Sequence, residues 1–217
     1  MKIINNKTMS GNKIHLHEKE LAKIARGNYS GYSDRKIALD NIKDKKLLND
    51  LAINAKDDWI KLESAIKCGN NEALLELIYS SNDEALRLEA ALEVKNESIL
   101  SEIAMNCEEI FHGSVAIGHV SDKNLLLKIT EHAKYNRLKA EAAMKIGDID
   151  VIMNLIHSLN DDWIRYQLAV AINHTEILQD LARSSTNQRV KKLANEWFDD
   201  IIFKNRSYKK SNYQFLN

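Results

Sequence analysis

Proline is absent from this chain of 217 residues, and glycine and cysteine are rare, with seven and two copies. Without proline and with so few glycines, the chain lacks the turn residues of an all-β protein and the composition of a collagen-like or proline-rich one. Two cysteines are too few for a disulfide scaffold and fit a reducing compartment. These absences exclude several protein classes before any motif is considered.

Long hydrophobic runs and an excess of one charge are also missing. No stretch reaches the roughly 18 apolar residues of a transmembrane helix, so no membrane span is expected. The first residues carry no apolar segment of signal-peptide length, which predicts a cytoplasmic protein. Lysine and arginine number 31, and aspartate and glutamate also number 31. The length suffices for one sizeable core or for a series of small ones.

A repeat of 26 residues runs through most of the sequence. Segment 59–68 has counterparts at 33–42, 85–94, 111–120, 137–146, 163–172 and 189–198. These seven copies share one register without an insertion. Such a period is typical of repeat architectures, in which each copy is one small structural unit.

The first segment of each copy shows one face of a helix. A column of mostly small residues lies at its centre: Ala38, Ser64, Ala90, Ala116, Ala142, Leu168 and Ala194. The columns four residues before and after are apolar, except for Asp34 and His112. Spacing of i, i+4 and i+8 marks one helix face, and alanine at its centre lets a neighbouring helix approach closely.

A second, shorter helix is predicted to follow in each copy. It opens on residues that can cap a helix: Asp44, Asn70, Asn96, Asp122, Asp148 and His174. Leucine or isoleucine follows four and seven residues later in every copy. Helices of two to three turns are unstable alone in water, so the stability must come from stacking. Segment 20–25 is similar to one more second helix and would begin the stack.

Two of the copies carry a resemblance to a known family. Their first helices open on Asp57-Asp58-Trp59-Ile60-Lys61 and Asp161-Asp162-Trp163-Ile164-Arg165. Followed by an alanine-rich helix and then a leucine-rich one, these segments resemble bacterial HEAT-like repeats of the short, 26-residue kind. The resemblance covers roughly residues 20–201, although the chain lacks the proline of standard HEAT repeats. It implies an all-α fold, a right-handed α-solenoid of HEAT/armadillo-like helix pairs with the first helices on the concave side.

The resemblance and the end of the periodicity after Phe203 predict three parts. These are a flexible N-terminus (1–14), a HEAT-like repeat solenoid (15–202) and a basic C-terminal tail or cap (203–217). Within the repeats, residues 57–131 hold 15 acidic and 6 basic side chains. That charge disfavours nucleic acid on the repeats and suits a basic protein partner. The alternative is that the acidic residues only keep the protein soluble.

Aromatic residues are scarce, and three of them share one repeat column. They are Trp59, Phe111 and Trp163, with Tyr166 three residues further on. Together with Leu62 and Leu88 they are predicted to form a partner-binding stripe on the concave face. The alternative, which the sequence leaves equally open, is that tryptophan packs over the loop between repeats.

A basic column also recurs, at Arg35, Lys61, Arg87, Lys139, Arg165 and Lys191. Most of its members follow an acidic or polar residue four positions earlier, which is favourable at a helix start. We interpret this column as a ladder between repeats rather than as a stripe that binds phosphates.

The fourth copy breaks the pattern. It places His112 in the apolar column and Gly113 in the basic one, and such breaks can mark functional sites. Three metal ligands cannot be assembled from the sequence, so satisfied histidines or a kink are favoured. The sequence contains no phosphate-binding loop, nucleophile elbow or paired cysteine motif. We therefore expect no enzyme activity, no cofactor and no metal.

The leading hypothesis is a non-enzymatic scaffold or adaptor that binds a protein partner on the concave face. The alternative is a nucleic-acid-binding or DNA-repair-type HEAT-like protein that uses its basic terminal segments. Its candidate residues are Lys204, Arg206, Tyr208, Lys209, Lys210 and Tyr213, because tyrosine beside basic residues can stack on single-stranded bases. The sequence predicts neither the identity of the partner nor the oligomeric state.

Overall fold

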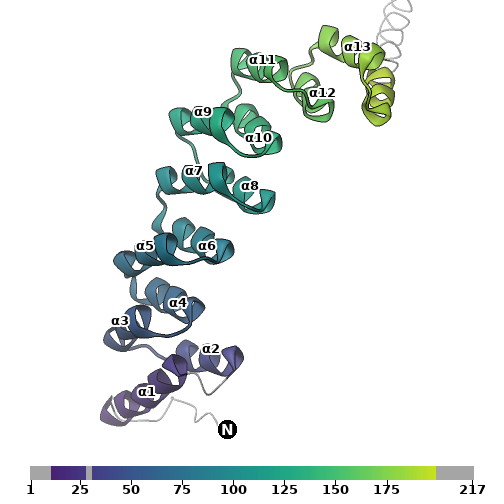
Figure 1. Cartoon of the computed structure of the whole chain (residues 1–217). Helices are drawn as coiled ribbons and strands as arrows, with labels where there is room; N and C mark the ends of the chain where they lie inside the picture. Colours follow the sequence, from purple (N-terminus) through teal and green to yellow (C-terminus); the bar gives the residue numbers. More distant parts are fainter. Residues whose placement is uncertain (1–10, 28–30, 199–217) are drawn as a thin grey trace, which may run out of the picture. The chain divides into compact units, whose positions relative to one another are not determined.

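The computed structural model describes residues 11–27 and 31–198, with side chains from residue 17 onward in the first helix. The regular elements in these ranges are all α-helices (Figure 1). The first helices of the repeat are α2 (Tyr32–Asp40), α4 (Asp58–Cys68), α6 (Glu84–Val94), α8 (Ile110–Gly118), α10 (Asn136–Ile146) and α12 (Asp162–Ala171). The second helices are α1 (Gly11–Arg26), α3 (Lys45–Asn54), α5 (Asn71–Ser80), α7 (Glu97–Asn106), α9 (Lys123–His132), α11 (Ile149–Ser158) and α13 (Thr175–Ser184).

Residues 188–198 form one more helix, at the end of the described part. The all-helical repeat is confirmed, and the second helices have the predicted two to three turns, but they are shorter than the first helices in only some copies, with 9 residues in α8 against 10 in α9. Both helices of a typical copy have about the same length, 11 residues in α4 and 10 in α5. Helix α1 begins at Gly11, ahead of the predicted start of the repeats at residue 15. The predicted C-terminal tail or cap (203–217) lies outside the described residues.

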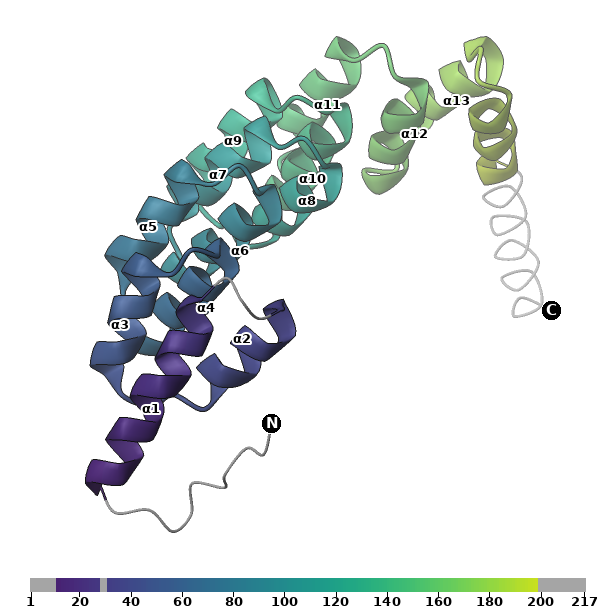
Figure 2. The ribbon, with the colours of Figure 1, turned by 60° about the horizontal axis from the view of Figure 1, so that its bottom comes forward.

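The chain divides into two compact units, residues 1–103 and 104–217. In unit 1, α3 packs on α4, α4 on α5 and α5 on α6, so that second and first helices form two layers (Figure 2). Its N-terminal core contains Leu39, Leu48, Leu51 and Ile60, together with Ala22 and Ala25 from α1. The predicted apolar columns are therefore among the residues that unit 1 buries, as Leu48, Leu51 and Ile60 show.

Unit 2 repeats the same arrangement. Helix α10 contacts α8, α9, α11 and α12, and α12 also contacts α11 and α13. Its core includes Ile156, Leu168, Leu178 and Leu181, which are each 0% exposed, together with Leu155, which is 7% exposed. Each unit is thus held together by contacts between neighbouring copies, as in other repeat proteins.

The capping column of the second helices is confirmed. The side chains of all six residues accept a hydrogen bond from a backbone N–H group in the first helical turn: Asp44, Asn70, Asn96, Asp122, Asp148 and His174. Each bond satisfies a donor that the helix itself cannot pair. The sequence therefore defines where each second helix begins.

Gly113, which breaks the basic column, lies at a close packing point inside unit 2. A Cβ atom at this position would lie 2.5 Å from Cδ1 of Leu138 and 2.7 Å from Sγ of Cys107. No side chain fits in that space without displacing a neighbour. The glycine of the irregular fourth copy is thus explained by packing at this position.

Candidate functional site

The basic column of the first helices is engaged within the chain. Arg35 pairs with Asp57 of the next copy, with 2.7 Å between Nη2 and Oδ2. Arg87 instead donates from Nε to the carbonyl oxygen of Ile78 near the end of α5, at 2.9 Å. Lys139 donates in the same way to a carbonyl near the end of α9. These side chains connect consecutive elements. The Arg35 pair has the acid–base form that the ladder interpretation predicts, and Arg165 likewise lies 3.7 Å from Oδ2 of Asp180 in α13.

The two Asp-Asp-Trp-Ile segments have the same geometry in the two units. In each, Oδ1 of the first aspartate, Asp57 or Asp161, accepts hydrogen bonds from the tryptophan and isoleucine N–H groups at 3.0 and 3.2 Å. The second aspartate pairs with the basic residue three positions later, at 3.1 Å in both segments. The motif therefore caps the start of the helix and places its tryptophan at the same helix position in both units.

Trp59 connects its copy to the next one. Its indole Nε1 donates to Oδ2 of Asp83 at 3.1 Å, and Asp83 is also the N-cap of α6. This contact is the one described by the alternative interpretation, in which tryptophan packs over the loop between repeats. Trp59 is half-buried, so part of its ring is occupied within unit 1.

Leu62 and Leu88 do not lie on a binding surface. Only 1% of Leu62 and 6% of Leu88 is exposed. Helix α4 packs against α5 on one side and α6 on another, so two of its faces are covered. Their predicted role in partner binding is therefore wrong: both leucines are core residues, covered by other parts of the chain.

Trp163 and Tyr166 come together in unit 2. Their rings stack with centroids 6.0 Å apart, and the Arg189 guanidinium lies 5.0 Å from the centroid of the Trp163 ring. Burial raises the pKa of the Tyr166 hydroxyl above its ordinary value, and the charge of Glu196 adds to this effect. Phe111 lies on α8 with 70% of its surface exposed. Within unit 2, this part of the chain thus supplies one compact aromatic pair, Trp163 with Tyr166.

A polar groove of about 450 Å³ runs beside Trp163, here called the Trp163 groove. It is lined by Asn136, Asn160, Asp161, Asp162, Trp163, Thr186 and Asn187. These residues come from the starts of α10, α12 and helix 188–198, where successive first helices begin. The lining offers amide donors and acceptors, two carboxylates and an aromatic edge, but no cationic side chain.

The sequence interpretation missed the amide and hydroxyl residues of this groove. Asn187 occupies the position equivalent to Asp161 and caps helix 188–198, with its Oδ1 accepting from Arg189 N–H at 3.1 Å. Ser185 donates to Oδ2 of Asp162 at 2.7 Å, which ties two neighbouring loops together. The available signal was the recurrence of asparagine and aspartate at the same loop positions of consecutive copies.

In the ranges 17–27 and 31–198, no three histidine, cysteine, aspartate or glutamate side chains form a group that could hold a metal ion. No described helix is both long and apolar enough to cross a membrane. The basic and tyrosine residues proposed for nucleic acid, 204–213, lie outside the described residues. Comparisons with known protein families, curated proteins and solved structures give no match. The helical repeat is therefore established by the 26-residue period and by the structure of the chain.

Proposed function

We propose that this chain is a bacterial HEAT-like repeat protein, a right-handed α-solenoid, that binds a protein partner without catalysing a reaction. Support for the family comes from helix pairs that recur every 26 residues and begin on the same capping column. Support for binding comes from one surface, the Trp163 groove of unit 2.

The Trp163 groove has the chemistry to bind an extended, basic peptide. The amide groups of Asn136, Asn160 and Asn187 can both donate to and accept from a peptide backbone. Asp161 and Asp162 supply negative charge, and the lining itself holds no cationic side chain, although Asp162 is paired with Arg165 outside the lining. This combination is the observation that carries the proposal, because it pairs sequence-independent backbone contacts with a preference for positive side chains.

The Trp163 ring adds an anchor to this surface. Arg189 already lies over the ring at 5.0 Å, a separation at which a guanidinium is attracted to an aromatic face. An arginine or lysine of the partner has the same chemistry and can compete for that position. We therefore assign partner binding to Trp163 and Tyr166, whereas Trp59 supports the repeat through Asp83.

The proposal is tested by identifying cross-linked partners of the full chain in extracts of its native source. Trp163→Ala and Asp161→Asn should each reduce capture of a partner that binds wild-type protein. Asparagine is also a good N-cap, so Asp161→Asn removes the charge while retaining the helix start.

Trp59→Ala is the matched control, because it removes a tryptophan from the equivalent position of unit 1. It should retain the partner, with helicity and thermal unfolding followed for every variant by circular dichroism. If Trp163→Ala and Asp161→Asn both retain every wild-type partner, the proposed surface is wrong. Capture that disappears on nuclease treatment would favour nucleic acid instead.

A further inference from the structure

Helix α1 departs from the other second helices at three neighbouring core positions. In the 26-residue register, residues 22, 25 and 26 correspond to Leu48, Leu51 and Ala52 of α3. Helix α1 carries Ala22, Ala25 and Arg26 there, and both alanines are buried, as their equivalents are. Two leucine side chains of α3 thus correspond to methyl groups in α1, and of the two alanines Ala22 lines a groove.

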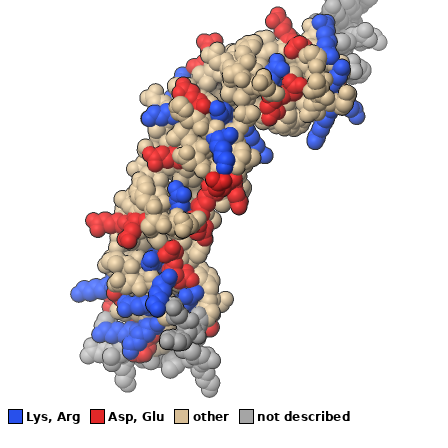
Figure 3. All heavy atoms as spheres, in the orientation of Figure 1, with Lys and Arg blue, Asp and Glu red and all other residues tan. Residues whose placement is uncertain are grey.

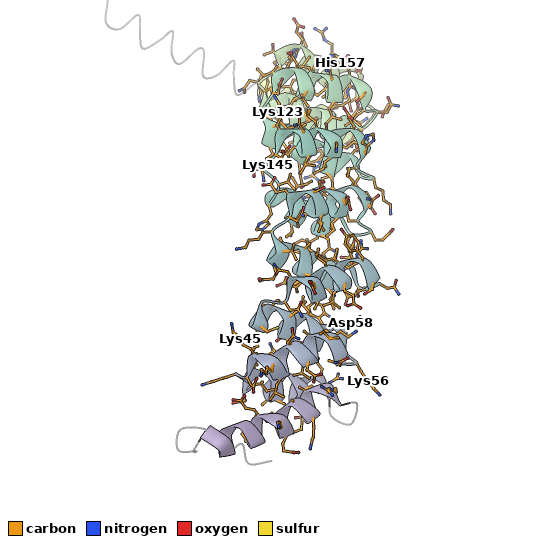
Figure 4. The ribbon with its side chains drawn as sticks, turned by 90° about the vertical axis from the view of Figure 1, so that its left-hand side faces the viewer. Lys45, Lys56, Asp58, Lys123, Lys145 and His157 are labelled. Atoms are coloured by element: carbon orange, nitrogen blue, oxygen red, sulfur yellow. The ribbon has the colours of Figure 1, made fainter. Side chains whose placement is uncertain are left out.

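A groove of about 680 Å³ lies at this place in unit 1, here called the α1 groove. It is lined by Lys19, Ala22, Lys23, Arg26, Gly27, Leu47, Asp50 and Lys56. Its apolar lining residues are the half-buried Leu47 and Ala22, which is 6% exposed, while four cationic side chains and one carboxylate surround them. Figure 3 shows lysine and arginine gathered over this end of unit 1, and Figure 4 shows Lys56 just beyond the C-terminal end of α3.

The positive charge of the α1 groove is only partly compensated by the chain. Arg26 pairs with Asp50, and Lys23 pairs with Glu20 at 2.7 Å. Lys19 and Lys56 have no ion-pair partner among the residues that the structure describes. A polar outer face is enough to keep a repeat stack in solution. That role does not require a groove with apolar residues in its lining.

We infer that the α1 groove binds an acidic peptide segment of a protein partner. Carboxylates of the segment meet Lys19 and Lys56, and its apolar side chains pack on Ala22 and Leu47. Single-stranded nucleic acid fits less well, because the groove lining contains no aromatic ring on which a base could stack. The inference concerns unit 1 and does not depend on the Trp163 groove of unit 2.

The test uses the full chain and a short fluorescent peptide of alternating glutamate and leucine, with binding followed by anisotropy at low ionic strength. The wild type should bind this peptide and should not bind one of alternating lysine and leucine. Reversing two groove charges, with Lys19→Glu plus Lys56→Glu, should weaken binding by about tenfold or more. Lys45→Glu plus Lys46→Glu makes the same charge change at the exposed start of α3, outside the groove, and should change binding by less than about twofold.

A third variant tests the hollow itself. Ala22→Leu introduces the side chain that α3 carries at this position, so it should block the peptide while leaving all charges in place. Thermal unfolding of the variant checks that the helices remain folded. A thymidine oligonucleotide is the competing probe, and its binding should not exceed that of the acidic peptide.

The inference is overturned if the wild type fails to bind the acidic peptide at low ionic strength. It is equally overturned if the Lys19 and Lys56 charge reversals leave binding unchanged. Tighter binding of the oligonucleotide, lost in the same charge variant, would assign the groove to nucleic acid. None of these results affects the test of the Trp163 groove, whose variants lie in the other unit.

Discussion

Gly113 shows how one residue can adapt a repeat to its neighbours. The other copies carry a basic or polar side chain in this column, but here Leu138 and Cys107 occupy the space that a side chain would need. Gly118, at the end of the same helix, has no atom within 4 Å of the position of a Cβ atom. The two glycines of α8 therefore differ in what they tolerate, although both lie in a helix.

Gly113→Ala should lower the free energy of unfolding by about 1–3 kcal/mol, because the added methyl group overpacks a filled space. Gly118→Ala is the control and should be neutral or stabilising by up to about 1 kcal/mol, because alanine favours the helix. Urea denaturation followed by circular dichroism measures both. Equal effects at the two positions would contradict the packing described for Gly113.

At the scale of the element, the ends of the first helices follow a rule of their own. Four residues spaced by whole repeats have a positive φ at or just after a helix end: Gly69, Lys95, Gly147 and Asn173. Glycine adopts this left-handed conformation at little cost, asparagine tolerates it, and lysine does so less readily. The left-handed conformation is therefore energetically less favourable for Lys95 than for Gly69, Gly147 and Asn173 at the equivalent positions.

Lys95→Gly should raise the free energy of unfolding by about 1 kcal/mol, because it relieves the left-handed conformation at the end of α6. Gly69→Ala, at the equivalent end of α4, should have the opposite effect. Chemical denaturation of the two variants and the wild type tests this pair. Destabilisation by Lys95→Gly would mean that the lysine side chain contributes more than its backbone costs.

The starts of α9 and α11 are joined by a charge pair that can be titrated. Lys123 Nζ lies 3.0 Å from Oδ2 of Asp148, which also caps α11. The hydrogen bond from Lys123 lowers the pKa of the Asp148 carboxyl below its ordinary value, against a smaller opposing effect of desolvation. Because the pKa is lower in the folded state, the stabilisation is present above the unfolded-state pKa and is lost as the pH falls through the folded-state value.

Lys123→Ala should therefore raise the pKa of Asp148 toward its ordinary value, which NMR titration of the carboxyl carbon measures. Lys128→Ala, on the exposed side of the same helix, should leave that pKa unchanged. High salt should reduce the difference between the wild type and Lys123→Ala, because exposed charges are screened. A pKa that is unaffected by Lys123→Ala would show that the N-cap hydrogen bonds alone lower it.

At the scale of the whole molecule, the 26-residue period made the helices and their starts predictable. Apolar residues that recur at the same position of every copy identify buried positions such as Leu74 and Leu100, which are each only 2% exposed. The burial of Leu62 was not predictable in this way, because it depends on α4 being covered by two neighbours. The Trp163 groove was missed for a related reason: its lining comes from three separate loops, and no single segment carries its signal.

Leu74→Ala should lower the free energy of unfolding by about 2–5 kcal/mol, whereas Glu76→Ala on the exposed side of α5 should change it by less than about 0.5 kcal/mol. Repeat proteins derive their stability from interfaces between neighbouring copies. Hydrogen exchange in Leu74→Ala should therefore accelerate in α4, α5 and α6 more than in α11, α12 and α13. A uniform acceleration would show that the two units unfold as one.

Side-chain contacts in the described part of the chain join each copy to the next one. Asn70 and Asn49, Arg35 and Asp57, and Lys67 and the carbonyl of Leu39 are separated by 21, 22 and 28 residues. Tandem duplication of 26 codons within the gene would therefore place the new copy between neighbours that carry matching contact residues. An insertion of one or two codons would instead break the spacing of every such pair that spans it. Growth and shrinkage of this protein during evolution are thus expected to proceed in whole copies.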